Sequence, residues 1–338
     1  MPPANLRLTV DTTALAANWC ALDRASGAAA CGAAVKADGY GLGASAVVRT
    51  LVRAGCRDFF VASWAEAAAL DIPAGARLAV LHGVQDGEMR VALASAAVPV
   101  LCTPAQVAAW RAAAPGRVCD VMIDTGMNRL GLEFKELNLL DGLTIDTVHS
   151  HLACADTPGH PMNARQLGRF RAVVATVPAK RASLANSCGI MLGPDYAFAL
   201  TRPGIGLYGG AVAGVAPVAE IEARVVQVRD IAAGDSVGYG ATWTAARTTR
   251  VAVLNIGYAD GYPCNLSNGG SVFADDATCP VIGRVSMDLV AADVTGADVR
   301  EGDWLRLDFD LPRAAAASGR SQYELLTGLG HRYARRYQ

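Results

Sequence analysis

The strongest constraint on the fold is a repeated alternation of short apolar runs with amphipathic, helix-like stretches over the first part of the chain. Apolar runs of strand length recur at residues 28–37, 58–63, 77–83, 98–103, 118–125, 144–153, 180–187 and 201–209. Stretches between them, such as 44–54, 104–114 and 163–177, carry apolar residues at helical spacing. Eight such strand–helix units predict a closed, TIM-like (β/α)8 barrel.

The pattern changes near residue 215. Strand-like runs at 221–231, 250–256, 281–285 and 304–309 follow one another through turns rich in glycine and aspartate, without long helices between them. We therefore expect an α/β plus β protein, with a barrel over residues 11–214 and a mainly β domain over 215–338. An N-terminal strand within residues 1–10 is expected to pack with the second domain.

Composition excludes several classes of protein. The 338 residues are 52% hydrophobic and 18% charged with a net charge of −1, which fits a two-domain globular chain and gives no general attraction for nucleic acid or membranes. The N-terminus lacks a secretory pattern, and the uncharged run at 203–219 is broken by glycines and a proline, so we expect a cytoplasmic protein. Nine cysteines without a C-x-x-C pair argue against disulfides and a metal site, and Cys188 is expected to be a small buried hydrophobe.

Polar residues gather at the predicted carboxyl ends of the barrel strands, where barrel enzymes carry their chemistry. They are Lys36, Arg129, His151, Asn186, Ser187, Arg202, Gly204 and Gly206. Each residue alone has an ordinary explanation as a surface cation, a core histidine or a turn glycine. Their joint placement favours a site.

The same mouth has the features of a phosphate site. Barrel enzymes often bind phosphate with the loops after strands seven and eight, where Ser187 offers a hydroxyl and residues 204–206 offer backbone N–H groups. A lysine in the same mouth can form a Schiff base with a carbonyl. The combination suggests a phosphate-bearing aldehyde cofactor.

Eight motifs, in order over nearly the whole chain, resemble those of the alanine racemase family. They are A-V-K-A-D-G-Y-G-L-G (34–43), I-D-T-G-M-N-R-L-G (123–131), H-S-H-L-A-C-A-D (149–156), L-A-N-S (184–187), R-P-G-I-G-L-Y-G (202–209), V-G-Y-G-A-T-W (237–243), I-G-Y-A-D-G-Y (256–262) and G-R-V-S-M-D (283–288). The resemblance implies racemisation of L- and D-alanine with pyridoxal 5′-phosphate, which would supply D-alanine for peptidoglycan. It also implies a homodimer with active sites shared between its subunits.

The resemblance also implies residue roles. Lys36 would hold the cofactor as a Schiff base and act as one base, and Tyr239 of the partner subunit would be the opposite base. The implied cofactor-binding residues are Lys36, Tyr40, Arg129, His151, Asn186, Ser187, Arg202, Gly204, Ile205 and His331. In this scheme Arg202 faces the pyridine nitrogen, with His151 bonded behind it. The implied substrate-binding residues are Arg129, Met287, Tyr258, Tyr262 and Asp288.

Two positions depart from the family pattern. Met122 stands where many members have a lysine that orients the barrel arginine, so Arg129 must be positioned by another group. His331 stands where members often have a tyrosine that reaches the phosphate. A histidine can still donate to phosphate, and the position is equally compatible with a surface role.

Three alternatives stay open at this point. The first is a broad-spectrum or serine racemase on the same scaffold. The second is a pyridoxal-phosphate decarboxylase with a similar barrel and β domain, but these use an acidic residue at the pyridine nitrogen, and Arg202 argues against them. The third is a non-catalytic cofactor carrier, which would lack the β domain and any equivalent of Tyr239.

Overall fold

The computed structural model describes residues 4–338, which form two compact units. One unit is Leu15–Ala216, and the other combines Pro217–Gln338 with the N-terminal residues up to Ala14. No helix in residues 4–338 is long and apolar enough to cross a membrane.

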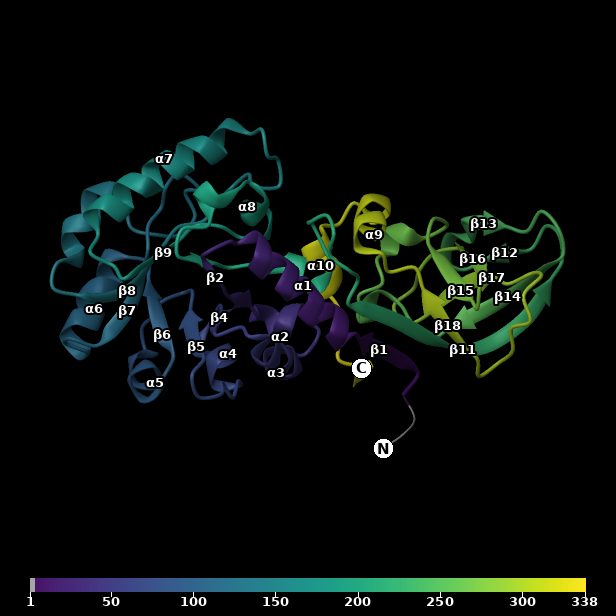
Figure 1. Ribbon diagram of the computed structural model, residues 1–338. Coiled ribbons are helices and arrows are strands. Elements are labelled where there is room, and N and C mark those ends of the chain that lie inside the picture. Colours follow the sequence, from purple (N-terminus) through teal and green to yellow (C-terminus); the bar gives the residue numbers. More distant parts are fainter. Residues whose placement is uncertain (1–3) are drawn as a thin grey trace. The chain divides into compact units, whose positions relative to one another are not determined.

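Parallel strands form the inner layer of Leu15–Ala216, and helices such as α5, α6 and α7 lie outside them (Figure 1). Hydrogen-bonded neighbours follow chain order through β3 (Ala33–Ala34), β4 (Asp58–Val61), β5 (Arg77–Val80), β6 (Val98–Leu101), β7 (Val118–Met122), β8 (Thr144–His149) and β9 (Arg181–Ser183). The ring closes through β10 (Leu200–Thr201), which pairs in parallel with β2 (Ala30–Cys31). On its other side, the Arg202 N–H donates to the Ala185 carbonyl just beyond β9 (2.9 Å). This ring confirms the predicted (β/α)8 barrel.

The first predicted strand is divided into β2 and β3 at Gly32. The Gly32 N–H donates to the Thr201 carbonyl (2.9 Å), and a Cβ here would lie 2.8 Å from both the Asp58 carbonyl and the Phe60 ring. Glycine therefore permits both neighbouring strands to approach at this point.

The helices of this unit start and end at recognisable signals. Ala44–Ala54 is helical as predicted. In the helix Pro104–Ala113, Thr103 caps the N-terminus and Pro104 occupies the first turn. The α-helices are α1 (Thr12–Ala25), which begins in the other unit, α3 (Ala44–Ala54), α4 (Trp64–Ala68), α5 (Met89–Ala94), α6 (Pro104–Ala113), α7 (Pro161–Thr176) and α8 (Ser187–Met191). The segment labelled α2 (Lys36–Tyr40) is a single turn whose residues 37–40 have left-handed rather than α-helical backbone angles. Short 3-10 helices are η1 (Phe134–Leu140), η2 (Pro194–Tyr196) and η3 (Ile205–Tyr208).

The last two barrel strands are shorter than predicted. β9 ends at Ser183 because Asn186 caps α8, so the chain turns into a helix at Ser187. β10 ends at Thr201, and Pro203 two residues later has no N–H to continue a ladder. Ser187 and residues 204–206 therefore belong to turns and helix starts at the mouth.

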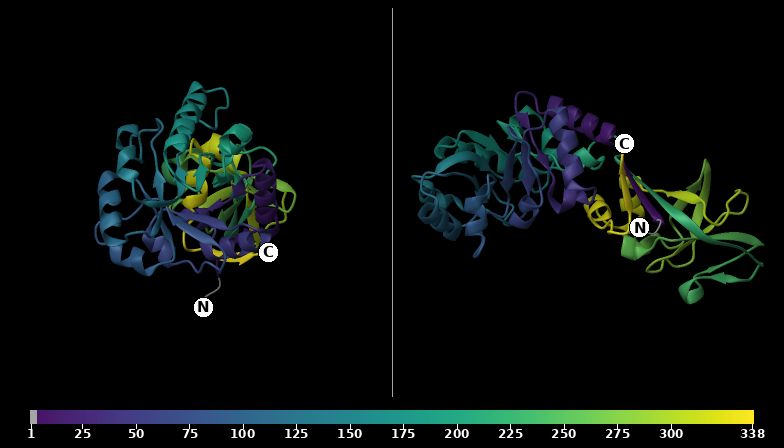
Figure 2. Two further views of the ribbon diagram at one scale, coloured as in Figure 1. Left: turned by 60° about the vertical axis from the view of Figure 1, so that its left-hand side comes forward. Right: turned by 90° about the horizontal axis from the view of Figure 1, so that it is seen from below.

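The second unit is a β barrel built around the long strand β11 (Ala219–Ile231), as Figures 1 and 2 show. This strand pairs with β18 through residues 222–224 and with β14 through residues 225–231, with a bulge between Val225 and Gln227 in the second ladder. The ring runs β11–β14–β17–β16–β15–β18 and returns to β11. Its other strands are β14 (Thr249–Leu254), β15 (Ser271–Ala274), β16 (Ala277–Ile282), β17 (Val290–Asp293) and β18 (Trp304–Leu307).

Further elements extend this ring. β1 (Leu6–Val10) pairs antiparallel with β11 and parallel with β19 (Ala334–Tyr337). Residues 1–3 of the predicted N-terminal strand lie outside the described residues. The remaining elements are β12 (Ser236–Val237), β13 (Trp243–Thr244), α9 (Leu311–Ser318), α10 (Gln322–Thr327) and the 3-10 helices η4 (Tyr239–Ala241), η5 (Tyr258–Asp260) and η6 (Cys264–Leu266).

Candidate active site

Lys36 lies at the carboxyl end of the first barrel strand, one residue after Val35, whose N–H donates to the Phe60 carbonyl (2.9 Å). Its side chain is half-buried. Burial lowers the pKa of the Lys36 amine, and the nearby charges of Arg129 and Arg202 lower it further. Glu66 acts in the opposite direction. A lysine with a lowered pKa is more often the neutral amine that attacks carbonyls and accepts protons.

Tyr40, four residues after Lys36, lies against Gly204. A Cβ at position 204 would overlap the Tyr40 hydroxyl oxygen and lie 3.0 Å from Tyr40 Cζ. Tyr40 is 5% exposed and stacks on Tyr208 with ring centroids 4.6 Å apart. Only a residue without a side chain fits beside this hydroxyl.

Ser187 is hydrogen-bonded to the loop that carries Gly204. Its Oγ accepts hydrogen bonds from the N–H groups of Gly204 (2.9 Å) and Gly206 (3.1 Å). Asn186 fixes this serine, because its Oδ1 accepts from the Gly189 N–H (2.8 Å) and so caps α8. A hydroxyl and backbone N–H groups gathered in this way are the kind of groups that bind anions, and the cluster of Ser187, Gly204 and Gly206 is called the anion cradle.

Arg202 is buried at the start of the last barrel loop and donates hydrogen bonds within the barrel. Its Nη2 donates to the Ser150 carbonyl (2.6 Å), and its Nη1 donates to His149 Nδ1 (3.2 Å) and to Ser183 Oγ. The prediction that His151 is bonded behind Arg202 is therefore wrong, because His149 on β8 occupies that place. Burial lowers the pKa of Arg202 to about 10, which still leaves it a cation at neutral pH.

His149 connects Arg202 to a buried acid. Since a guanidinium only donates, His149 Nδ1 accepts, and its Nε2–H must donate to Asp120 Oδ2 (3.0 Å). Burial lowers the pKa of His149 to about 4, so the ring is neutral. Burial pushes the pKa of Asp120 upward, but the bond from His149 and the charge of Arg77 outweigh it and hold it below its usual range.

His151 lies two residues beyond His149 and faces the cations of the mouth. Burial, then Arg202, Arg129 and Lys36, lower the pKa of His151 to about 3. Its carbonyl accepts from Gln166 Nε2 (2.8 Å), which anchors the backbone to α7. His151 therefore offers a neutral imidazole close to these charges.

Arg129 is exposed on a turn held by its backbone. Asp124 Oδ1 accepts from the N–H groups of Gly126 (2.8 Å) and Asn128 (3.1 Å), and Asp124 N–H donates to the Leu132 carbonyl (3.0 Å). Met122 is buried beneath this turn, and its carbonyl accepts from the Leu132 N–H (2.8 Å). The hydrogen bonds of this turn, rather than a neighbouring lysine, thus fix the position of the Arg129 backbone.

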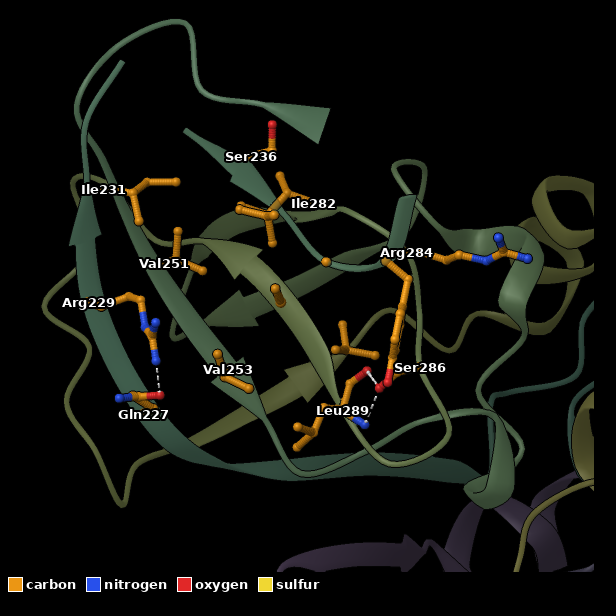
Figure 3. A pocket seen from close by; sticks show the side chains of 15 residues that line it. Gln227, Arg229, Ile231, Ser236, Val251, Val253, Ile282, Arg284, Ser286 and Leu289 are labelled. Atoms are coloured by element: carbon orange, nitrogen blue, oxygen red, sulfur yellow. Dashed lines mark hydrogen bonds between the residues drawn. The ribbon is translucent and has the colours of Figure 1, made fainter. Parts of the chain in front are cut away.

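In the second unit, Tyr239 is one of the residues that line a mainly apolar hollow of about 610 Å³. The tyrosine is 71% exposed and follows Gly238, whose φ of 77° lies in the left-handed region. Ile231, Val251, Val253 and Ile282 line the hollow (Figure 3). Its rim includes Ser286, whose Oγ accepts from the Leu289 N–H (3.1 Å).

The other predicted residues of this unit differ in exposure. Met287 is 53% and Tyr258 45% exposed, while Asp288 forms an ion pair with Arg332 (2.7 Å). His331 is exposed. Tyr262 is 4% exposed, and its hydroxyl faces Gly270, where a Cβ would overlap it. The prediction that Tyr262 lines a substrate entrance is therefore wrong, because its side chain is enclosed within its own unit.

The sequence interpretation missed three polar residues that surround the predicted site. Asp120 and His149 lie within the barrel behind Arg202, and Glu66 contacts the turn that follows Lys36. Asp120 had a detectable signal, since it is a single charge inside the apolar strand V-C-D-V-M. His149 ends β8 and His151 follows two residues later, so the H-S-H pattern offered two candidates.

Comparison with known proteins gives full-length matches of one kind. The profile of the alanine racemase N-terminal domain matches residues 10–212, and that of the C-terminal domain matches 218–337. The chain is 45% identical to the biosynthetic alanine racemase of Agrobacterium fabrum, over 99% of this chain and 94% of the relative. It is also 45% identical to the alanine racemase of Dinoroseobacter shibae, over 99% and 98%. The structure matches that of alanine racemase from Bartonella henselae with covalently bound pyridoxal phosphate (TM-score 0.92, 35% identity, 99% and 100% coverage).

Proposed function

Because the chain belongs to the alanine racemase family, we propose that it interconverts L-alanine and D-alanine with pyridoxal 5′-phosphate bound to Lys36. The observation that carries the proposal is the joint placement of a lysine of lowered pKa and an anion cradle in one barrel mouth. The alanine racemase of Bartonella henselae holds pyridoxal phosphate covalently in its crystal structure, which supports the assignment.

The residues of the mouth fit this cofactor. Tyr40, Ser187, Gly204 and Ile205 offer the hydroxyl and N–H groups that a phosphate requires, and the glycine leaves no room for a Cβ. Lys36 offers the amine for the aldehyde. When bound, the cofactor stabilises the negative charge that develops at the substrate α-carbon.

Arg202 would face the ring nitrogen. A guanidinium is a permanent donor, so it would hydrogen-bond this nitrogen without giving up its proton. Its bonds to the Ser150 carbonyl and His149 Nδ1 orient it. By leaving the cofactor's ring nitrogen neutral, Arg202 would limit the withdrawal of charge from the α-carbon and would favour prompt return of the proton over side reactions. This arrangement suits a racemase better than a decarboxylase.

We assign the substrate carboxylate to Arg129, helped by the backbone N–H of Met287 of the partner subunit. Arg129 stands exposed on a turn braced by Asp124, so its charge is available. The Ser286 carbonyl, which shares a peptide group with the Met287 N–H, accepts from the Tyr258 N–H (3.0 Å), and this bond orients the peptide. Tyr258 and Asp288 remain proposed residues of the entrance, while Tyr262 is withdrawn.

Two bases exchange the α-proton. Racemisation removes a proton from one face of the α-carbon and returns one to the other face, so the simplest arrangement places one base on each. We propose Lys36 Nζ for one face and Tyr239 Oη of the partner subunit for the other. One base gains a proton as the other loses one, so their protonation states are exchanged by each turnover.

A homodimer is required by this scheme. Its support in this chain is the exposure of Tyr239 beside the apolar hollow, since an exposed apolar surface rimmed by polar groups is typical of a protein contact. We further propose that the product D-alanine serves peptidoglycan synthesis; of the two relatives from Agrobacterium fabrum, the one named biosynthetic is 45% identical to the chain and the one named catabolic is 43% identical.

Chiral chromatography of L-alanine incubated with the purified protein and pyridoxal phosphate tests the proposal. We expect D-alanine to accumulate toward an equal mixture, and Lys36→Ala to abolish both turnover and the visible absorbance of the bound cofactor. Full activity of Lys36→Ala would refute the assignment of the lysine. Cofactor binding without D-alanine, but with racemisation of L-serine or other amino acids, would replace alanine by the broader substrate class.

A further inference from the structure

The chain that follows Lys36 makes a left-handed turn that side chains rarely adopt. Ala37 (φ 53°), Asp38 (φ 52°), Gly39 (φ 63°), Tyr40 (φ 57°) and Gly41 (φ 83°) are consecutive in this region. Residues with a Cβ are disfavoured there, and such conformations persist where the surroundings hold them. The turn therefore needs external support.

Glu66 supplies this support at the start of the turn. Its Oε1 accepts from the Ala37 N–H (2.8 Å), and its Oε2 accepts from the Ala62 N–H (2.7 Å), just beyond β4. Ser63 caps α4, and its Oγ accepts from the N–H of Glu66 itself (3.4 Å). Both carboxylate oxygens are thus used, and they tie the residue after Lys36 to the neighbouring barrel strand.

The end of the turn is held separately. Asp38 Oδ1 accepts from the Ala44 N–H at the start of α3 (2.8 Å), and the Asp38 carbonyl accepts from the Gly43 N–H (2.8 Å). Tyr40, within the turn, has its hydroxyl against Gly204 in the anion cradle. The turn therefore links Lys36, at its start, to Tyr40, whose hydroxyl lies against Gly204 of the anion cradle.

We propose that Glu66 is a positioning residue for Lys36, holding the left-handed turn so that the amine and the phosphate cradle keep one fixed relation. The inference rests on the proposed role of Lys36 as the residue that binds the cofactor. Glu66 does not need to touch the cofactor, because it acts through the Ala37 peptide.

The charges around Lys36 agree with this role. Arg129 and Arg202 lower the pKa of the amine, and the neutral His151 lies near the same cations. Among the charged groups acting on Lys36 within residues 4–338, Glu66 is the one that raises its pKa. Loss of the carboxylate should therefore move the Lys36 titration to lower pH as well as loosen the turn.

Two amide variants distinguish the effect of losing the hydrogen bonds that Glu66 accepts from the effect of losing a negative charge. Glu66→Gln leaves one acceptor for two N–H donors, so one of the two bonds must break. Asp38→Asn also removes one negative charge but keeps the single acceptor that Ala44 uses. The measurement is the rate at which the full-length protein, freed of cofactor, captures pyridoxal phosphate, followed by absorbance and borohydride trapping from pH 6 to 10.

We expect Glu66→Gln to slow capture by about tenfold, in line with one unsatisfied N–H group, and to lower its pH midpoint by about one unit. Asp38→Asn should match the parent protein in both readouts. Turnover should show a fall in kcat with little change in KM, because the substrate contacts are intact. Glu66→Gln with the parent's capture rate and pH midpoint would overturn the proposal. Capture by Lys36→Ala would instead overturn the proposed function.

A second variant guards against a general folding defect. Glycine adopts the left-handed region without a Cβ penalty, so adding Ala37→Gly to Glu66→Gln should recover part of the lost capture rate. A double variant no faster than Glu66→Gln would show that the effect does not pass through the turn, and would also overturn the proposal.

Discussion

Replacing Gly204 with alanine places a methyl group where the Tyr40 hydroxyl now lies. The new Cβ would overlap that oxygen and lie 3.0 Å from Tyr40 Cζ. Tyr40 has little freedom to move, because it is 5% exposed and stacked on Tyr208 at 4.6 Å. The ring or the 203–206 loop must therefore shift, and both carry proposed phosphate contacts.

The size of the effect follows from overpacking. Inserting a methyl group into a filled site costs roughly 1–3 kcal/mol. If the cost falls on the cofactor-bound state, where Tyr40 and the loop must hold their places, the Kd for pyridoxal phosphate rises by about 5- to 150-fold. Titration of the cofactor-free protein by absorbance measures this change, and thermal unfolding reports any cost shared with the free state.

Two further variants make the result specific. Gly159→Ala is the matched control, because a Cβ there meets nothing within 4 Å, and it should bind the cofactor as the parent protein does. Tyr40→Phe removes the overlapping oxygen, so the pair Tyr40→Phe and Gly204→Ala should lose less affinity together than the sum of the single losses. Unchanged affinity and unfolding temperature in Gly204→Ala, or simple additivity of the pair, would refute the reasoning.

The remaining predictions concern the bases, acid stability and assembly. Tyr239→Phe should bind the cofactor and melt normally, because its side chain is 71% exposed, yet lose racemisation by at least ~10²-fold in the chiral assay; normal turnover would remove this residue from the mechanism. His149 has its pKa lowered by burial to about 4, so the unfolded chain takes up a proton first, and stability is lost as pH falls from about 6.5 to 4. His149→Gln should flatten the unfolding temperature over that window, and an unchanged slope would contradict the assignment. Sedimentation should show that active protein is dimeric, and a fully active monomer would exclude a shared site.

The barrel was predictable because most of its strands lie within mainly apolar runs and helices such as α4 and α6 carry capping residues at their starts. The helix at Ala44–Ala54 follows directly from periodicity and the glycines around it. Strand ends were not predictable to the residue, because β10 is only two residues long and its length depends on pairing with β2. β17, with the sequence V-A-A-D, was missed for a related reason: its place depends on partners rather than on its own pattern.

The mouth residues were predictable because the rule that chemistry lies at the carboxyl ends of the strands needs no coordinates. The support behind them was not, since Asp120, His149 and Arg202 belong to β7, to β8 and to the segment after β10, which meet only when the ring closes. Tyr262 shows the opposite error. Its motif suggested an exposed residue, but the fold of its unit encloses it against Gly270.

The order of groups inside the barrel explains how Arg202 is both oriented and charged. A carboxylate in direct contact with Arg202 would pair with its charge and compete with any acceptor at the mouth. Here the His149 ring lies between Asp120 and Arg202. The ring is neutral, and it is hydrogen-bonded to both side chains. Arg77 contacts Asp120 from the other side (2.5 Å) and balances its charge there. The positive charge of Arg202 is therefore left to act at the mouth, where it lowers the pKa of both Lys36 and His151.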